Sequence, residues 1–195
     1  MSGAPASDDS ALNFSHVPSN ESPGVREHSH KGKDSMTNTS AVAPRRTPFV
    51  PADFQVPAGL SADDFRLRML TVHDLVRDFE AVMSSREHLL AMDPGGSWPE
   101  GLTLEQNLID LGWHQKEFQR RTSFAYTVVD QTDERTLGCV YIYPCEAPDT
   151  DAEIFLWARQ SELGAGLEER LLAAVQRWIC EDWPFSAVAY PGRRD

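Results

Sequence analysis

Residues 157–178 read WARQSELGAGLEERLLAAVQRW and hold the most specific chemical pattern in the chain. An apolar strand end runs into a short turn with Gly164 and Gly166, and an amphipathic helix follows at once. Such a turn can direct backbone N–H groups and a helix N-terminus at a phosphate. Glu168 and Glu169 in the first helical turn also suit a helix N-terminus that holds no ligand. The pattern therefore indicates either a phosphate-binding turn or an ordinary strand-to-helix connection.

Cysteine and histidine chemistry has little support in the sequence. The chain has three cysteines and no CxxC pair, so we expect free thiols in a reducing compartment rather than a disulfide framework or a zinc site. The HSH of residues 28–30 is a weak metal signal inside a polar segment. We therefore predict no metal site.

The elements that must position the glycine turn follow from hydrophobic periodicity. Alternating patterns predict strands over 65–71, 123–130, 137–144, 152–159 and 185–192. Helical spacing predicts helices within 72–92, over 103–122 and over 166–183, with Thr103 and Gln106 as a capping box. The predicted buried stripes of the last two helices are Leu104, Leu108, Leu111 and Phe118, and Leu167, Leu171, Leu172, Val175, Trp178 and Ile179.

The order of these elements predicts a single α+β layer. The segments 123–130 and 137–144 form a hairpin, and the final strand–helix–strand unit forms a parallel crossover. Alternation along 152–159 places Glu153, Phe155 and Trp157 on one face of the sheet and Ile154, Leu156 and Ala158 on the other.

The N-terminal quarter has a different composition from the rest. Residues 1–50 are rich in Ser, Pro, Gly, Asn and Thr, so we expect a disordered tail. The three prolines of residues 45–60 disfavour helix, so we expect residues 51–64 to be an extended linker and residues 65–195 to form the folded domain.

Taken together, the element order and the turn resemble the GNAT superfamily of acyl-CoA N-acyltransferases. The resemblance covers roughly residues 65–192 and implies a mixed, mainly antiparallel sheet with helices on both faces. The usual C-terminal helix and strands of that family are not matched, since nothing remains beyond PGRRD, residues 191–195. A partner chain, as in a homodimer, or residues 51–64 would then cover an exposed sheet edge.

The resemblance also implies the co-substrate and the residues that hold it. The family's Arg/Gln-x-x-Gly-x-Gly/Ala turn binds the pyrophosphate of acetyl-CoA through backbone N–H groups. In this register Leu163 replaces the arginine and Glu168 replaces the last glycine, so we expect weak binding that rests on the main chain. The implied cofactor-binding residues are Trp157, Ala158, Leu163, Gly164, Ala165, Gly166 and Leu167.

Acetyl transfer to an amine needs a base, an oxyanion site and an acid. Glu153 resembles the carboxylate often found on this strand in the family, and a solvent-facing structural role is the alternative. For the acid the sequence offers Tyr126, Tyr141, Tyr143 or Tyr190, of which we select Tyr143. His114 and Trp98 are candidates for the acceptor site, which the first two helices border in GNAT proteins.

The formal net charge of −12 falls on the region after residue 50, because the charges of residues 1–50 sum to zero. An acidic surface argues against nucleic acid and anionic membranes as partners and favours a cationic or amine partner. The N-terminus has no signal-peptide pattern, so we expect a cytoplasmic location. The sequence thus predicts an N-acetyltransferase that transfers an acetyl group to a small-molecule or protein amine. A catalytically inactive GNAT-fold binding module is the alternative.

Overall fold

The computed structural model of this protein describes residues 48–193. Most of the predicted tail, with its HSH sequence, therefore lies outside the described residues. Six strands form one sheet in chain order: β1 (Gly59–Ser61), β2 (Arg66–Met69), β3 (Phe124–Val129), β4 (Thr136–Pro144), β5 (Ala152–Ala158) and β6 (Val188–Ala189). Each neighbouring pair is antiparallel except β5 and β6, which are parallel. The predicted hairpin and the predicted parallel crossover are both confirmed.

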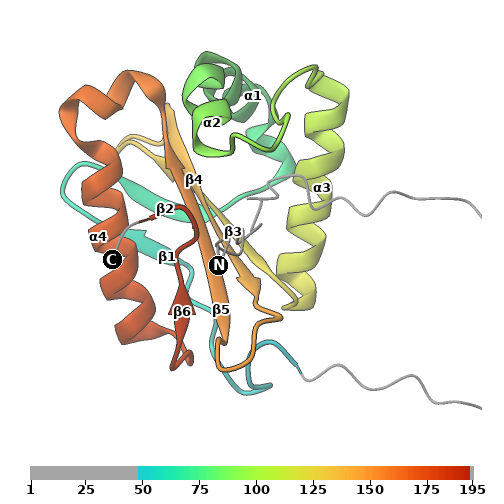
Figure 1. The fold of residues 1–195 in the computed structure, drawn as a ribbon, viewed down its shortest axis with the longest axis vertical. Coiled ribbons are helices and arrows are strands. Elements are labelled where there is room, and N and C mark those ends of the chain that lie inside the picture. Colours follow the sequence, from blue (N-terminus) through green and yellow to red (C-terminus); the bar gives the residue numbers. More distant parts are fainter. Residues whose placement is uncertain (1–47, 194–195) are drawn as a thin grey trace, which may run out of the picture.

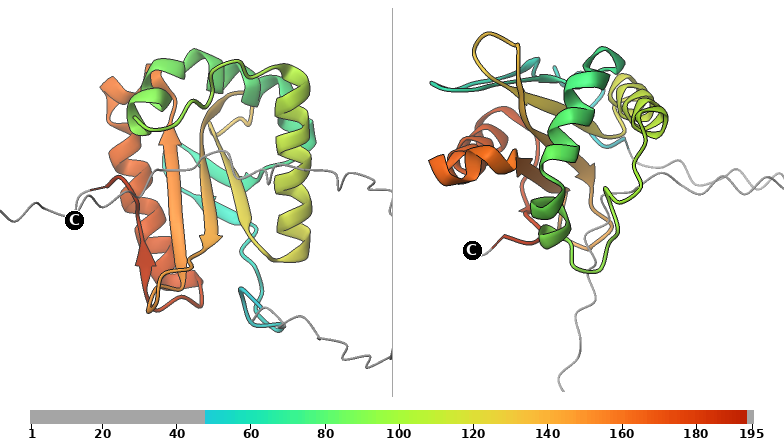
Figure 2. Two further views of the ribbon diagram at one scale, coloured as in Figure 1. Left: turned by 45° about the vertical axis from the view of Figure 1, so that its right-hand side comes forward. Right: turned by 90° about the horizontal axis from the view of Figure 1, so that it is seen from above.

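Helices cover both faces of the sheet (Figures 1 and 2). They are α1 (Leu75–Ser84), α2 (Arg86–Met92), α3 (Leu104–Arg120) and α4 (Leu167–Asp182), with short 3₁₀ turns at Val72–Asp74 and Gln160–Ala165. Buried apolar residues of α4 pack against Ile154, Leu156 and Ala158, whereas α1, α2 and α3 pack against Tyr141 and Trp157. The predicted division of β5 between two faces, and the predicted α+β class, are confirmed.

The segment 72–92, predicted as one helical stretch, is divided at Ser85. This residue lies outside helical geometry, with φ −111° and ψ 12°, and it ends α1 and precedes α2. Its buried hydroxyl oxygen accepts a hydrogen bond from the N–H of Gln160 at 3.0 Å. At the same point the Ser85 N–H donates to the carbonyl oxygen of Val82, three residues back, at 3.0 Å, which is the tighter 3₁₀ pattern common at helix ends.

The inward face of α3 differs from the predicted leucine stripe. Leu104 and Leu108 are 45% and 42% exposed, whereas Leu111 is buried. The side chains that face the protein include Asn107, Asp110, Leu111 and His114, which have the same i, i+3, i+4, i+7 spacing. The prediction is therefore wrong for Leu104 and Leu108, because polar residues take inward positions there, and it is confirmed for Leu111 and for Phe118, which packs against the core. The capping box of Thr103 and Gln106 is confirmed.

Two predicted extended segments contain less or more strand than expected. Within 51–64, Gly59–Ser61 forms β1 and pairs with β2, so this segment adds an edge strand to the sheet. Within 185–192, only Val188–Ala189 is a strand, and it pairs with β5 through two residue pairs. The sheet therefore has one more strand at its first edge than the sequence predicts, and the strand at its last edge is shorter than predicted.

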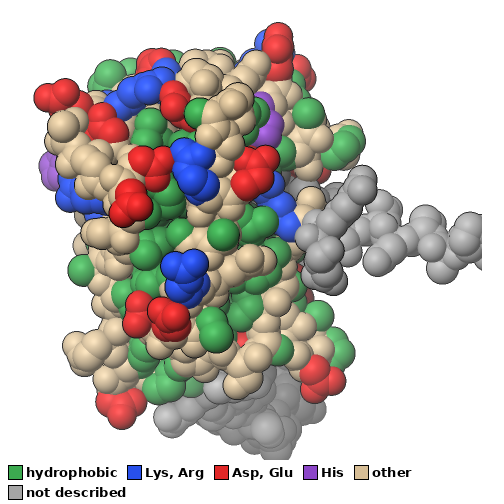
Figure 3. Space-filling view, turned by 90° about the vertical axis from the view of Figure 1, so that its left-hand side faces the viewer, with side chains coloured by type: hydrophobic (Ala, Val, Ile, Leu, Met, Phe, Trp, Pro, Cys, Tyr) green, Lys and Arg blue, Asp and Glu red, His purple; other side chains and the backbone are tan. Residues whose placement is uncertain are grey.

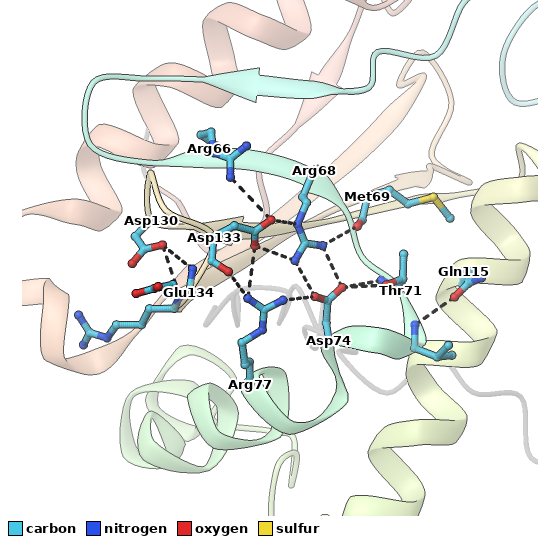
Figure 4. A network of polar contacts seen from close by, with 12 residues as sticks. Arg66, Arg68, Met69, Thr71, Asp74, Arg77, Gln115, Asp130, Asp133 and Glu134 are labelled. Atoms are coloured by element: carbon cyan, nitrogen blue, oxygen red, sulfur yellow. Dashed lines mark hydrogen bonds and ion pairs between the residues drawn. The ribbon is translucent and has the colours of Figure 1, made fainter.

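A network of charged side chains joins β2, the start of α1 and the β3–β4 turn (Figure 4). Arg68 donates to the nearly fully buried carboxylate of Asp74 at 2.6 and 3.0 Å and to Asp133 at 2.9 Å. Arg77 of α1 contacts the same two acids. Hydrogen bonds and charge from Arg68 outweigh the burial that would raise the pKa of Asp74, so this pKa lies below its usual value. The network fixes α1 relative to the sheet.

Replacement of Arg68 by methionine is expected to destabilise the protein by about 3 kcal/mol, because it leaves a buried carboxylate without its main partner. Urea unfolding measures the change in the free energy of unfolding. Arg66→Met is the matched control, since within residues 48–193 the one ion pair of Arg66 is with Asp133, at 3.6 Å, and its side chain is 36% exposed. Its expected cost is below about 1 kcal/mol. Equal losses from the two variants would contradict the assigned role of Arg68.

Candidate functional site

At the edge of the sheet beside α4, β5 has a neighbouring strand only along its first residues. Strands β5 and β6 pair only at Ala152 with Val188 and at Glu153 with Ala189. After β6 the chain rises beside β5 and turns toward α4 (Figures 1 and 2). The outward backbone groups at the end of β5, which face away from β4, are therefore not paired with another strand. We call this region, formed by the end of β5, the 160–165 turn and the start of α4, the α4 edge.

Side chains of this protein form hydrogen bonds with the backbone groups at the end of β5. Arg193 donates to the carbonyl oxygen of Leu156 at 2.8 Å and to the Glu168 carboxylate at 2.7 Å. The N–H of Ala158 donates to Glu168 at 3.4 Å, and the ring Nε2 of His88 lies 2.9 Å from the same carboxylate. Glu168 thus joins α4 to β5, to α2 and to the segment after β6.

The environment keeps Glu168 negatively charged. Burial alone would raise its pKa, but hydrogen bonds from His88 and Arg193, together with the charge of Arg193, outweigh burial and hold the pKa at about 2. The carboxylate therefore carries a full negative charge at neutral pH, close to the N-terminus of α4. A negative charge in this place favours the helix dipole and opposes the approach of an anionic ligand.

The residues predicted to bind the cofactor separate into buried and surface groups. Trp157 and Leu167 are buried in the core, Leu163 packs against the core on the α4 side, and the backbone of Ala158 meets Glu168. The surface members are Gly164, Ala165 and Gly166. Gly166 begins α4 with φ +70° and ψ 28°, and its N–H donates to the carbonyl oxygen of Leu163 at 2.9 Å. A side chain at Gly164 would meet open space.

In the described arrangement the backbone at the end of β5 is not free for a pantetheine chain, because Glu168 and Arg193 already bond it. A diphosphate at the start of α4 would also meet the negative charge of Glu168. The arginines of this region are each paired with a carboxylate: Arg135 with Glu162, Arg159 with Glu80, Arg170 with Asp64, and Arg193 with Glu168. Figure 3 shows acidic and basic side chains interspersed over this face, with hydrophobic side chains between them. A pantetheine chain that contacted the end of β5 would therefore have to displace Glu168 and Arg193.

A cavity of about 380 Å³ lies on the other side of the sheet, between α1, α3 and the 93–102 loop. We call it the α1–α3 cavity. Its apolar and aromatic lining comes from both helices, from the loop and from the sheet: Leu70, Val82, Trp98, Leu102, Ile109, Leu111, Trp113 and Tyr141. Three carboxylic acids and two amide side chains also line it: Asp78, Glu100, Asp110, Gln106 and Asn107. No residue of β5 is among the described residues that line this cavity.

The carboxylates of the α1–α3 cavity differ in burial: Asp78 is buried, Asp110 is half-buried and Glu100 is exposed. Asp78 is buried on α1, where it accepts a hydrogen bond from the Nδ2 of Asn107 at 2.9 Å. Burial raises the pKa of Asp78 to about 6, despite this hydrogen bond. Burial also raises the pKa of Asp110. Among the described residues, Asp110 has no hydrogen-bond or ion-pair partner.

His114 lines the same cavity, as the sequence suggested, and packs between two rings. Its imidazole centroid lies 4.9 Å from Trp113 and 5.1 Å from Tyr141. Its buried Nδ1 has no hydrogen-bond partner within residues 48–193. Burial lowers the pKa of His114 to about 4, so the ring is neutral at physiological pH. Trp98, the other predicted acceptor-site residue, also lines the cavity.

The predicted catalytic pair, Glu153 and Tyr143, are cross-strand neighbours in register on β5 and β4. Cys145 Sγ lies 3.0 Å from the Glu153 carboxylate, to which it donates. The Tyr143 ring stacks on Tyr141 with centroids 6.1 Å apart. Burial raises the pKa of Tyr143, which keeps its hydroxyl protonated. Neither residue lines the α1–α3 cavity, so their catalytic roles stay predictions.

Sequence reasoning missed several polar residues of these two regions. His88 and Arg193 contact Glu168 from segments that are far from it in the sequence. Local residue spacing does not predict such contacts. Asp78 and Asp110 did leave a signal. Asp78 lies three residues after Leu75 and four before Val82, on the apolar face of α1, where an acid is unexpected.

Comparisons with known proteins identify the fold through solved structures, whereas the sequence comparisons give no match. No protein-family model matches the chain, and no curated protein matches it either. Among residues 48–193, none of the helices has the length and apolar character that crossing a bilayer requires.

Solved structures do match. The ribosomal-protein-S5-alanine acetyltransferase from Vibrio fischeri has a TM-score of 0.53 and 18% identity over 63% of this chain and 67% of its own. A ribosomal-protein-serine acetyltransferase structure from Vibrio cholerae gives 0.51 and 13% over 63% and 66%. The microcin C7 self-immunity acetyltransferase MccE, in complex with acetyl-CoA and AMP, gives 0.51 and 13% over 63% and 67%. The chain therefore has the fold of the GNAT acetyltransferases.

Proposed function

We propose that this protein is an N-acetyltransferase that transfers an acetyl group from acetyl-CoA to an amine held in the α1–α3 cavity. The observation that carries the proposal is the position of this cavity beside α1 and α3. In the GNAT family, which the sequence resembles, the first helices of the domain border the acceptor site. Both α1 and α3 precede the β3–β4 hairpin and belong to these first helices. A cavity of about 380 Å³ falls within the range of small-molecule sites. A cytoplasmic location belongs to the same proposal.

The residues of the cavity suit the acceptor half of such a reaction. A protonated amine must lose a proton before it attacks a carbonyl carbon. The cavity offers proton acceptors at Asp78, Asp110 and the Nδ1 of His114. The thioester, when bound, supplies the acetyl group. Glu153 as a base and Tyr143 as an acid remain part of the proposal, although both lie outside the cavity.

A second candidate is a GNAT-fold protein that binds an amine without catalysis. The closed α4 edge favours it, because Glu168 and Arg193 occupy the backbone groups that a pantetheine chain would otherwise contact. The two candidates differ in whether this closure can be displaced by acetyl-CoA. Binding and turnover measurements therefore separate them.

Millimolar acetyl-CoA is expected to raise the melting temperature, since a ligand that binds only the folded state stabilises it by mass action. Gly164→Glu is expected to abolish the shift, because it adds a negative charge on the turn without a steric conflict inside the protein. This variant is preferable to Gly166→Glu, since Gly166 has φ +70° and any side chain there is strained. Ala147→Glu, in the exposed loop before β5, is the control. Absence of any shift in the unmodified protein would exclude the enzyme proposal.

Arg193→Met is expected to tighten acetyl-CoA binding roughly tenfold. Breaking a charged hydrogen bond costs about 1.5–3 kcal/mol, and the variant no longer has to break the contacts of Arg193. Calorimetric titration measures the affinity, and thiol release across an amine panel measures turnover. Arg177→Met is the control, since Arg177 is an exposed arginine on α4. Weaker binding by Arg193→Met would instead make Arg193 a ligand of the co-substrate and contradict the closure.

A further inference from the structure

The α1–α3 cavity holds negative charge that the protein does not balance. No Lys or Arg is among the described residues that line it. Glu100 is paired with Arg86 at 2.7 Å, outside the cavity lining. Asp78 has only the neutral amide of Asn107 at 2.9 Å, and Asp110 has no partner within residues 48–193. Asp78 is buried and Asp110 is half-buried, and neither has a cation beside it, so a cationic ligand would be favoured next to both acids.

Aromatic rings form much of the remaining wall. Trp98 and Trp113 come from the loop and from α3, and Tyr141 comes from β4. The negative faces of such rings attract ammonium groups and stack on flat apolar groups. The wall therefore suits a ligand that carries both a cation and an aromatic group.

The buried Nδ1 of His114 is an independent sign of a missing ligand. Buried polar atoms are nearly always hydrogen-bonded, and this one has no partner in the described part of the chain. Because the ring is neutral, it does not neutralise the neighbouring acids. An ammonium group with three N–H donors can bond to Asp110 and still have donors for the other acceptors of the cavity.

We propose that the α1–α3 cavity binds a small primary arylalkylamine in its protonated form, with Asp110 as the anionic partner of the ammonium group and the tryptophans around its ring. Asp110 takes this role rather than Asp78, because Asp78 already bonds Asn107 and lies deeper in the core. The cavity volume of about 380 Å³ admits one small molecule or one amino-acid side chain. The inference rests on the proposed function in treating the cavity as the acceptor site.

A set of matched small molecules tests the inference on the protein without acetyl-CoA. Calorimetric titration with 2-phenylethylamine is compared with 2-phenylethanol and with 3-phenylpropionate. The amine is expected to bind at least tenfold more tightly than the alcohol, and the carboxylate is expected not to bind. Equal affinities for the amine and the alcohol, or absence of amine binding, would overturn the inference.

Variants of α3 test the role of Asp110. Asp110→Asn is expected to weaken binding of 2-phenylethylamine at least tenfold and to leave binding of the alcohol unchanged. Glu105→Gln is the matched control, because it removes the same charge from an exposed position of the same helix. Equal losses in the two variants would reduce the effect to overall charge and contradict the assignment. Asp110→Glu, which retains the charge, is expected to recover part of the affinity and guards against misfolding of the first variant.

The outcome for the proposed function is measured separately. Amine binding that depends on Asp110, without acetyl transfer, would uphold the inference and exclude the enzyme proposal. Acetyl transfer to amines with a KM that Asp110→Asn does not change would uphold the enzyme and overturn the inference.

Discussion

The ion pair between Arg68 and the buried carboxylate of Asp74 is the contact on which the α1 side of the sheet depends. Asp74 stands at the entry to α1, and a carboxylate in that position must be neutralised before the helix can rest on the sheet. Arg68 meets this need from β2, and its second contact, with Asp133, fixes the β3–β4 turn at the same point. The angle at which α1 leaves the sheet is therefore set by charge pairing as well as by apolar packing. The α1–α3 cavity exists because α1 is held in that position.

The two sides of the sheet represent two uses of buried charge. At the α4 edge, Glu168 is satisfied by His88, Arg193 and a backbone N–H, so the negative charge is balanced inside the protein. In the α1–α3 cavity, Asp110 has no such partner among the described residues. The contacts of Glu168 stabilise the fold and close the α4 edge. The carboxylate of Asp110, in contrast, is left able to bind a cation. The α4 edge is thus closed by balanced charges, whereas the α1–α3 cavity keeps a carboxylate without a cationic partner among the described residues.

The fold was largely predictable because its long elements have regular hydrophobic periods. The α4 stripe, the alternation along β5 and the β3–β4 hairpin are local patterns, and each is found in the structure. The inward face of α3 was not predicted, because the exposed Leu104 and Leu108 carry the hydrophobic signal and the polar Asn107 and His114 point inward. Hydrophobic periodicity identifies the core only where burial is apolar. A helix that borders a polar cavity violates that condition.

The contacts that close the α4 edge could not be predicted for a different reason. Arg193 and Leu156 are separated by 37 positions, and Ser85 and Gln160 by 75. Such pairs depend on the path of the chain in three dimensions and leave no trace in local spacing. The sequence could show that Leu163 and Glu168 depart from the family pattern, but only the structure shows which groups fill the space.

The left-handed conformation of Gly166 has a consequence for how this sequence would change over generations. Any other residue at φ +70° would strain the start of α4, so selection for a stable fold alone is enough to keep the glycine. Gly164 has no such constraint, because a side chain there meets open space. Among relatives that had lost the reaction, the second glycine would persist while the first drifted. Retention of Gly164 across related sequences, rather than of Gly166, would be the mark of selection for a ligand at this turn.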